Sequence, residues 1–171
     1  MLHNGILVPE LNLPAILARR PQVVLVDELA HTNVPGAKNE KRWQDVAELL
    51  NAGIDVISAV NVEQIESLHD VATKITGLTP TETIPDEVLR APAQIKVVDL
   101  DPKELSKRLA SGLIFPPERI DAAISSYFRL GNLIALRELA LLWLAGEVDQ
   151  DLINYRDAHN IASSAAPPTI R

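Results

Sequence analysis

The stretch VVLVDELAHTN, residues Val23–Asn33, is the strongest structural signal in this chain of 171 residues. Four aliphatic residues run directly into Asp27 and Glu28, and a polar loop that begins at His31 follows. A short apolar run of this kind predicts a strand buried in a parallel sheet and covered on both faces. Ligands of open α/β sheets bind beyond the carboxyl ends of the strands. The acidic pair and the loop are therefore candidate site residues.

Three more segments around this stretch have strand character. Ile54–Val60 follows Gly53 and is rich in valine and isoleucine, so it predicts a second buried parallel strand. Ile95–Leu100 predicts a third strand, and Thr81–Ile84 predicts a shorter and weaker one.

Helical patterns alternate with these runs. Lys41–Leu50 places Trp43, Val46, Ala47 and Leu50 on one face, and Gly53 supplies a stop. Further helices are expected from a cap at Asn61 to Gly77, from Asp101-Pro102, from Pro116-Pro117 and from near Asn132. The alternation predicts an α/β fold with a mostly parallel sheet, followed from Pro116 to about His159 by helix only.

A strand that ends in Asp27 and Glu28 has the pattern of a Walker B element. In that interpretation Asp27 holds Mg²⁺ through water and Glu28 orients an attacking water. The alternative interpretation is a pair that caps the following turn. Both remain open at this point.

The residues that follow have two interpretations as well. His31, Thr32 and Asn33 could contact a γ-phosphate in the manner of a switch segment, or they could hold a turn through hydrogen bonds to the backbone. Asn61 ends the second strand on the same rim, either as a site residue or as a helix cap. The histidines show no zinc-binding spacing, so Asp27 is the only metal ligand that we expect.

A phosphoryl-transfer site also needs a glycine-rich phosphate loop, and the chain contains no Gly-Lys dipeptide. Gly36-Ala37-Lys38 is the nearest sequence, but it follows the acidic strand instead of preceding it. No nucleophile elbow of a hydrolase is present either. We therefore expect no catalytic residue and no bound cofactor in this chain by itself.

Composition excludes several other classes. The net charge of −7 and the isoelectric point of about 5.1 argue against binding to nucleic acid. The absence of cysteine removes disulfides and thiolate sites and fits a cytoplasmic location. The longest apolar stretch, Leu139–Gly146, is far shorter than the roughly 20 residues that cross a bilayer, so no direct membrane insertion is expected.

Several long motifs, in family order, resemble the cytoplasmic N-terminal sensor domain of KdpD-type osmosensitive potassium-channel sensor kinases. They are VLVDELAHTNVPG (Val24–Gly36), KRWQDVAELLNAGIDV (Lys41–Val56), VNVEQIESLHD (Val60–Asp70), TETIPDEVL (Thr81–Leu89), VVDLDPKELSKRL (Val97–Leu109), FPPERI (Phe115–Ile120) and FRLGNLIALRELAL (Phe128–Leu141).

The resemblance implies a P-loop-NTPase-like, three-layer parallel sheet that binds ATP and Mg²⁺ in the family. It implies a sensor domain over residues 11–161, with an α/β part at 11–115, a helical part at 116–161, an extra segment at 1–10 and a tail at 162–171. The family's phosphate loop and first strand would precede residue 1, so the sheet is expected to be truncated there. The family's full-length protein lies in the bacterial inner membrane.

The implied function is that of a regulatory input module in a two-component system for potassium transport and osmotic response, without kinase activity of its own. The alternatives are an active P-loop-type NTPase and a structural interaction domain or degraded remnant. Expected partners are the remaining domains of a sensor kinase, or a kinase supplied in trans. Leu141 and Val148 form a second apolar face on the Leu130–Leu152 helix, so a homo-oligomer is also expected.

Overall fold

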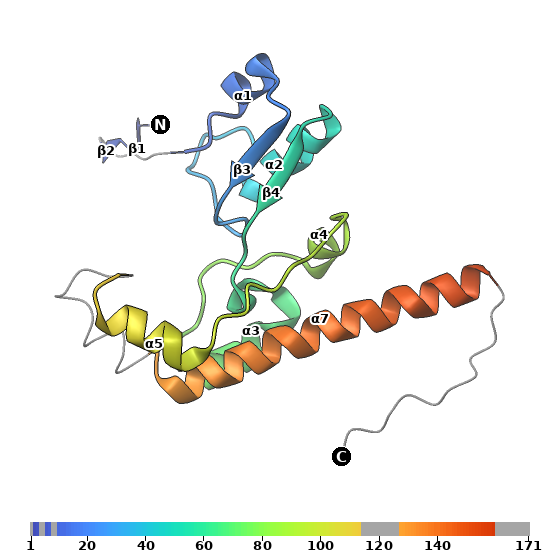
Figure 1. The fold of residues 1–171 in the computed structure, drawn as a ribbon. Coiled ribbons are helices and arrows are strands. Elements are labelled where there is room, and N and C mark those ends of the chain that lie inside the picture. Colours follow the sequence, from blue (N-terminus) through green and yellow to red (C-terminus); the bar gives the residue numbers. More distant parts are fainter. Residues whose placement is uncertain (1, 4–5, 8–9, 114–126, 160–171) are drawn as a thin grey trace.

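The computed structural model describes residues 2–3, 6–7, 10–113 and 127–159. Its elements follow one another as β1 (Leu2–His3), β2 (Ile6–Leu7), α1 (Leu13–Arg19), β3 (Val23–Val26), α2 (Arg42–Asn51), β4 (Asp55–Ser58), η1 (Val62–Gln64), η2 (Glu66–Leu68), α3 (His69–Thr76), α4 (Asp86–Arg90), α5 (Pro102–Ala110) and α7 (Leu130–Ala158). Figure 1 shows two regions. The sheet region contains α1, β3, α2 and β4, and the helical region is built along α7.

The sheet region is an α/β unit, as predicted. Strands β3 and β4 pair in parallel, with Val23 opposite Asp55 and Val26 opposite Ser58. Helix α2 connects them and packs against β4. The buried side chains of this core are Leu13, Val26, Leu29, Ala30, Val46, Leu49, Ile54, Ile65, Ile84 and Leu89.

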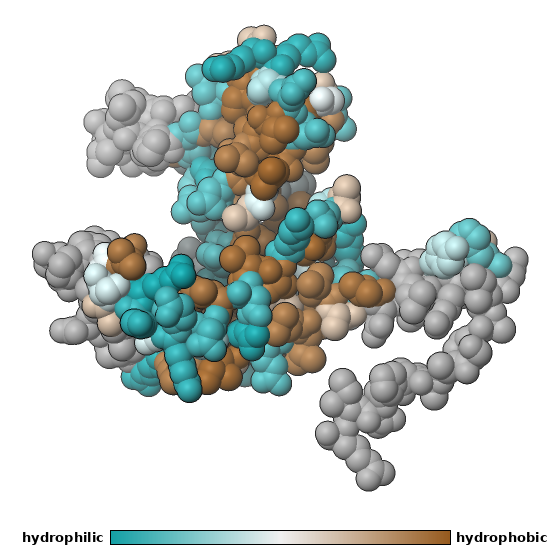
Figure 2. Space-filling view, viewed as in Figure 1, coloured by the Kyte–Doolittle hydropathy of each residue, from teal (hydrophilic) through white to brown (hydrophobic). Residues whose placement is uncertain are grey.

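The prediction that both faces of these strands are covered is wrong. The register places Val23, Leu25 and Ile57 on one face, and all three are exposed, Leu25 to 75%. Only the opposite face, which includes Val26, packs into the core. Figure 2 shows the apolar atoms gathered over β3 and β4. A parallel sheet normally carries helices on both faces, so this apolar face is the unusual feature of the unit.

Helix α2 begins and ends where the sequence predicts, within one residue. The Gln44 side chain accepts a hydrogen bond from the Lys41 N–H at 2.9 Å, and Gly53 follows the helix with φ of 75°. The buried face differs in part from the predicted stripe. Val46 and Leu49 are buried, whereas Ala47 and Leu50 are exposed. The helix is therefore turned about its own axis relative to the predicted orientation, so that the neighbouring row of side chains faces the core.

The single helix predicted between Asn61 and Gly77 is divided into η1, η2 and α3. The division arises because Ile84 pairs with this segment through its backbone: Glu66 donates to the Ile84 carbonyl, and Ile84 donates to that of Gln64. Those groups are then unavailable to a continuous helix. The weak strand predicted at Thr81–Ile84 is accordingly reduced to one bridge, between Ile65 and Ile84.

The third predicted strand, Ile95–Leu100, does not form. The segment has no regular structure, and Val98 is 94% exposed. It lies beside α7, where the Arg137 guanidinium binds both carboxylate oxygens of Asp99 at 2.5 and 2.6 Å. A β-prone run forms a strand only where a neighbouring strand satisfies its backbone. The next element, α5, starts as predicted with the Asp101 side chain as its cap.

The long helix predicted from near Asn132 is α7, which has 29 residues. Leu133 and Leu136 are buried against its neighbours, and the helix packs on α3, α5 and η1. The helix predicted from Pro116-Pro117 lies outside the described residues, as does the predicted domain boundary at 115/116. Among the described helices, none combines the length and the apolar character needed to cross a membrane.

Candidate functional site

The candidate site lies at the carboxyl ends of β3 and β4. Asp27 and Glu28 follow β3 directly, and Asn61 follows β4 by three residues. The strands stay joined beyond their ends, because Leu29 donates its N–H to the Ala59 carbonyl at 3.0 Å and the Ser58 hydroxyl donates to the Val26 carbonyl at 2.6 Å. This edge is where the architecture predicts ligands.

The turn at Asp27 and Glu28 has an unusual backbone. Glu28 has φ of 53°, in the left-handed region that side-chain-bearing residues seldom adopt. The Asp27 carboxylate accepts the Glu28 N–H at 2.8 Å, so it holds this turn. Both side chains are exposed. The turn thus presents two carboxylates to solvent at the edge of the sheet, at a backbone cost of roughly 1–2 kcal/mol.

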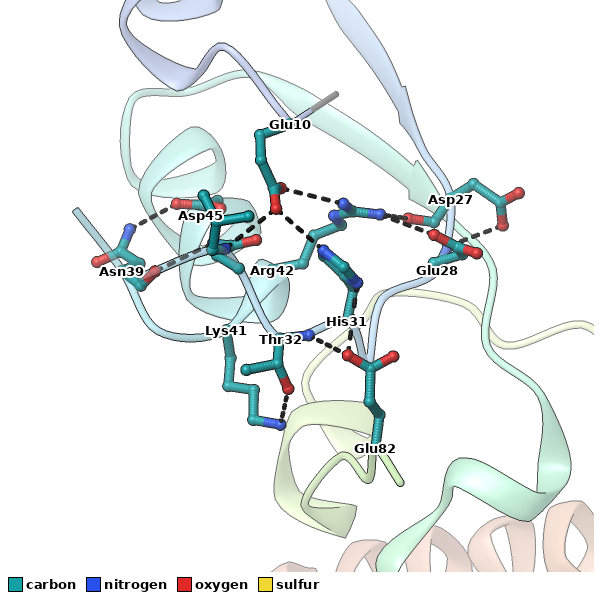
Figure 3. Close-up of polar contacts among 12 residues, drawn as sticks. Glu10, Asp27, Glu28, His31, Thr32, Asn39, Lys41, Arg42, Asp45 and Glu82 are labelled. Atoms are coloured by element: carbon teal, nitrogen blue, oxygen red, sulfur yellow. Dashed lines mark hydrogen bonds and ion pairs between the residues drawn. The ribbon is translucent and has the colours of Figure 1, made fainter. Parts of the chain in front are cut away.

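Arg42, at the first position of α2, ties this turn to the rest of the site (Figure 3). Its guanidinium donates to the Asp27 carbonyl at 3.1 Å and to the Glu28 carboxylate at 3.3 Å, both from Nη1. Its Nη2 donates to Glu10 at 3.4 Å. Its Nε is buried and has no hydrogen-bond partner among the described residues.

Glu10 is the central acceptor of the network. Its side chain is only 6% exposed and accepts from the Val34 N–H at 3.1 Å, and it also lies 3.2 Å from the His31 ring. Burial by itself raises the pKa of Glu10. The bonds from His31 and Val34, with the charges of His31 and Arg42, outweigh this and hold the pKa below its usual value. Glu10 is therefore an ionised, paired carboxylate inside the loop.

His31 lies between two carboxylates. Its Nε2 is 3.2 Å from Glu10 and its Nδ1 is 3.4 Å from Glu82. A ring that carries protons on both nitrogens donates to both at once. Glu82 also accepts the Thr32 N–H, and the Lys41 ammonium donates to the Thr32 hydroxyl at 2.7 Å. The loop is thus bonded to a segment 50 residues away.

Asn33 points into the protein. Its amide donates to the buried Asp45 carboxylate at 2.7 Å and to the Asn39 carbonyl at 3.1 Å. The Asn39 amide donates to the second Asp45 oxygen at 2.7 Å. Asp45 lies in the first turn of α2, where the helix dipole favours a negative charge. Asn33 therefore fixes the loop to α2.

Asn61 occupies the cap position of η1, and its N–H donates to the Gln64 side chain at 3.1 Å. Its side chain is exposed. Asn61 thus takes the predicted cap position, but the bond there runs from its backbone to the Gln64 side chain, and its own side chain makes no capping hydrogen bond. A ligand role for Asn61 stays a prediction.

The structure brings the six predicted site residues to one edge in two groups. Asp27, Glu28 and Asn61 are exposed, whereas the His31 ring, the Thr32 N–H and hydroxyl, and the Asn33 amide nitrogen are bonded within the loop network. The Oδ1 atom of Asn33 is buried without a hydrogen-bond partner among the described residues. Five charged residues of that network were not among the predicted site residues: Glu10, Lys41, Arg42, Asp45 and Glu82. Arg42 begins a helix next to the site, which was a usable signal. Glu10 and Glu82 are far from the loop in sequence and carried no such signal.

The side chains at this edge match part of what Mg²⁺ and ATP require. Two exposed carboxylates suit Mg²⁺, which takes one or two protein carboxylates and completes its shell with water and phosphate oxygens. Within the residues that the structure describes, no group of three or more acidic, histidine or cysteine side chains forms a self-sufficient metal site. The nearby cations Lys41 and Arg42 already have partners. The edge therefore fits the metal side of a nucleotide site better than the phosphate side.

Residues 1–148 match the sequence profile of a family described as KdpD, osmosensitive K⁺ channel His kinase sensor domain. The chain belongs to this family. It is 58% identical over 163 residues to the sensor protein KdpD of Rathayibacter rathayi, covering 95% of this chain and 19% of the relative. It is 56% identical over 162 residues to that of Mycobacterium tuberculosis strain H37Rv, with the same coverage of 95% and 19%.

The sensor protein KdpD of Escherichia coli K12 is 47% identical over 154 residues, 90% of this chain and 17% of the relative. The chain thus spans less than a fifth of the length of these KdpD proteins. The KdpD match covers the whole candidate site, including Glu10, Glu82 and α2.

Proposed function

We propose that this chain is a regulatory input module of a potassium- and osmosensing two-component system, and that it responds to nucleotide at the Asp27–Glu28 turn. Membership in the KdpD sensor-domain family carries the regulatory part of the proposal. The exposed acidic turn at the end of β3 supports the nucleotide part. The remaining domains of a sensor kinase, or a kinase in trans, are the partners, the location is cytoplasmic, and the chain itself supplies no kinase activity.

The geometry supports a route from the turn to the rest of the chain. Glu28 shares the Arg42 guanidinium with Glu10. If Glu28 turns outward to orient a water beside a bound nucleotide, Arg42 loses one of its acceptors, and its buried Nε–H already lacks one among the described residues. Arg42 is the first residue of α2, so a change in its bonding alters how the loop packs on that helix. Switch segments work through such exchanges of partner.

We also propose that β3, α2 and β4 form part of a larger, three-layer sheet of the P-loop type. The exposed face of Val23, Leu25 and Ile57 supports this, because parallel sheets are covered on both sides. The phosphate loop of such a sheet has no counterpart in the sequence, which lacks a Gly-Lys dipeptide. We therefore expect the chain alone to bind Mg-ATP poorly, with a Kd weaker than about 1 mM by calorimetry. Micromolar binding would show that the chain has its own phosphate site.

The test of the proposal places the chain in a complete sensor protein. It replaces the matching segment in the sensor protein KdpD of Escherichia coli, and autophosphorylation is measured at low and high potassium with Mg-ATP present. We expect a potassium-dependent response that Asp27→Asn and Glu28→Gln each reduce about tenfold or more, because charge-assisted bonds are lost. An unchanged response in both variants would exclude a nucleotide role for the turn.

A matched control uses an exposed carboxylate at the opposite end of the sheet. Asp55 begins β4, at the amino edge, and is exposed. Asp55→Asn removes the same charge without touching the carboxyl edge, so the response should stay within about twofold of that of the parent. Equal losses in Asp27→Asn and Asp55→Asn would indicate a general charge effect.

A second candidate function is that of a protein-interaction domain. The observation that favours it is again the apolar face of Val23, Leu25 and Ile57. In the same chimera, Leu25→Lys would then abolish the response while Asp27→Asn leaves it intact. The nucleotide proposal expects Asp27→Asn to reduce the response.

A further inference from the structure

Helix α7 carries a second apolar surface that the other described elements leave exposed. Ile134, Leu141, Val148 and Tyr155 recur at intervals of seven residues and are exposed to between 38% and 59%. We call these four residues the outer stripe. The buried residues Leu133 and Leu136 lie on a different face, roughly 100° away around the helix. The outer stripe is therefore separate from the packing on α3 and α5.

The seven-residue spacing identifies the kind of surface that fits the outer stripe. An α-helix has 3.6 residues per turn, so an apolar repeat of seven drifts by only about 20° per repeat. Such a row buries continuously only against another helix that supercoils around it with the same repeat. Glu138 and Ala145, which are also exposed, lie between the stripe residues on the same side. The fitting partner is thus an amphipathic helix about 32 Å long.

We propose that the partner is α7 of a second copy of this chain, paired antiparallel. The outer stripe itself has the seven-residue apolar repeat that a partner helix requires. With the two helices antiparallel and centred between Leu144 and Ala145, Leu141 lies opposite Val148 of the other copy, and Ile134 lies opposite Tyr155. Every stripe residue then meets an apolar one, and the two-fold axis uses the same surface twice.

The charges along α7 determine the direction. Residues 130–144 contain one arginine and one glutamate, so their net charge is zero. Residues 145–158 contain four carboxylates and one arginine, a net charge of −3. Paired helices lie about 8–10 Å apart, comparable to the screening length at physiological salt. A parallel pair brings the two acidic halves together, whereas an antiparallel pair places each against the less acidic half and also opposes the helix dipoles favourably. The order is unchanged by the ion pairs Arg137–Asp99 and Glu147–Arg90, which take one charge from each half.

The surroundings of α7 allow this arrangement. In Figure 1 the C-terminal end of α7 extends away from α3 and α5. Nearer the middle of the helix, Glu147 pairs with Arg90 of α4 at 2.9 Å. The half that begins at Leu130 packs on them, and its stripe residues Ile134 and Leu141 still face solvent. In the pair, the projecting half of each copy covers the outer face of the packed half of the other. This pairing does not depend on a nucleotide site.

The first experiment measures the mass of the complete chain by sedimentation equilibrium from micromolar to millimolar concentration. We expect a dimer, and Leu141→Glu should weaken it by about 100-fold, because each dimer loses two apolar contacts. Leu142→Glu is the matched control. It introduces the same charge at the next residue, which is exposed but about 100° from Leu141 on the helix, and it should change the dimer constant less than threefold.

Two outcomes of this experiment overturn the proposal. A monomer at all concentrations would show that the outer stripe does not pair with a second copy. A dimer that Leu141→Glu and Val148→Glu leave intact would mean that another surface, such as the sheet face at Leu25, makes the contact. Circular dichroism checks that the variants keep their helix content, so that a lost dimer is not a lost fold.

The second experiment tests whether the two α7 helices pair antiparallel. The chain contains no cysteine, so an introduced cysteine is the only thiol available for cross-linking. Leu141→Cys and Val148→Cys chains are oxidised separately and as a mixture. In the antiparallel pair two Leu141 positions are about 10 Å apart along the axis, too far for a disulfide, whereas Leu141 and Val148 are opposite. We expect cross-linked dimer only in the mixture. Efficient cross-linking of each variant with itself would show a parallel pair and overturn the proposal.

Discussion

The sheet region and the helical region are held together by different means. Around the end of β3, the chain is fixed by buried or partly buried polar contacts between distant residues, such as Glu10 with His31 and Asn33 with Asp45. Along α7, apolar packing is supplemented by ion pairs that are largely exposed, such as Arg137 with Asp99. Buried polar contacts specify one arrangement of a loop, because each unpaired group costs free energy. Exposed ion pairs contribute little.

This contrast suggests different roles for the two regions: the sheet region positions a ligand site, and the helical region offers a surface for docking. In the sheet region, polar contacts hold the loop in one conformation beside an exposed acidic turn, as a ligand site requires. The helical region leaves an apolar stripe in solvent, as a docking helix does. The two regions nevertheless share one core, since Ile65, Ile84 and Leu89 belong to the same buried cluster as Val26, and Trp143 packs against it.

The largest effect is expected from removing a core side chain in either region. Leu49 of α2 and Leu109 of α5 are both fully buried, so Leu49→Ala and Leu109→Ala should each lower the free energy of unfolding by about 2–5 kcal/mol. Trp43 and Trp143 both pack against the buried cluster that contains Leu49. Urea unfolding of Leu49→Ala, followed by the fluorescence of each tryptophan in single-tryptophan variants, should therefore show the same shifted midpoint.

Different midpoints from the two tryptophans would contradict a shared core. If Leu49→Ala lowers the midpoint reported by Trp43 and leaves that of Trp143 unchanged, the two regions unfold independently. Leu142→Ala, at an exposed position of α7, provides the control and should move neither midpoint by more than about 0.5 kcal/mol.

A smaller loss is expected from the polar network of the sheet region. Asp45→Ala removes one of two acceptors from each of the Asn33 and Asn39 amides. The Asn33 amide, which is buried, keeps the Asn39 carbonyl, and the Asn39 amide keeps Glu48. The expected cost is about 1–3 kcal/mol, measured by urea denaturation at neutral pH. Asp99→Ala breaks an exposed pair in the helical region and should cost at most about 1 kcal/mol. Equal costs would refute the contrast between buried and exposed bonds.

The pH dependence compares one carboxylate in each region. Burial raises the pKa of Asp86, but the Ser67 hydroxyl and N–H, the Trp143 indole and Arg90 outweigh it, so that the pKa is lowered as in Glu10. A lowered folded-state pKa stabilises the fold above the unfolded value, near 4 for these side chains, and this stabilisation is lost as pH falls through the folded value.

Glu10→Gln and Asp86→Asn should therefore each lower stability at pH 7 and flatten its decline below about pH 4. Thermal unfolding between pH 7 and pH 3 measures this. The exposed Glu40→Gln provides the baseline. If stability falls as steeply below pH 4 in Glu10→Gln as in the parent, Glu10 is not a paired carboxylate in the folded state.

The smallest effect is expected on the exposed face of the sheet. Leu25→Lys should change the free energy of unfolding by no more than about 0.5 kcal/mol, because the side chain is largely in solvent. Val98→Lys, at a similarly exposed position beside α7, is the matched change in the other region. A loss above about 2 kcal/mol in Leu25→Lys alone would show that another element covers this face in solution.

The sequence located the strands β3 and β4, helix α2 and the caps of α5 because those signals are local. Val23–Val26 is a short apolar run, Gly53 permits the left-handed turn, and the Asp101 side chain caps its own helix. Ile95–Leu100 failed for the complementary reason. Its apolar pattern is that of a strand, but within the part of the chain that the structure describes no strand pairs with it, and Arg137 holds it beside α7.

The candidate site was predictable only where local sequence signals define it. Asp27, Glu28 and Asn61 follow strand ends, so parallel pairing was enough to bring them to one edge. Whether they bind nucleotide stays a prediction. The engagement of His31 by Glu10 and Glu82 could not be predicted, since those residues lie 21 and 51 positions away and no local rule connects them.

The sequence by itself determined which segments become helices and strands near their own caps and turns, and which acidic residues end a strand, because those choices depend on neighbours within a few positions. Only the tertiary structure decided which apolar faces are buried, as the contrast between Leu49 and Leu25 shows. It also decided that Glu10, Arg42 and Glu82 meet around His31. Burial and charge pairing between distant residues depend on how the whole chain packs, and a periodic pattern does not specify its partner.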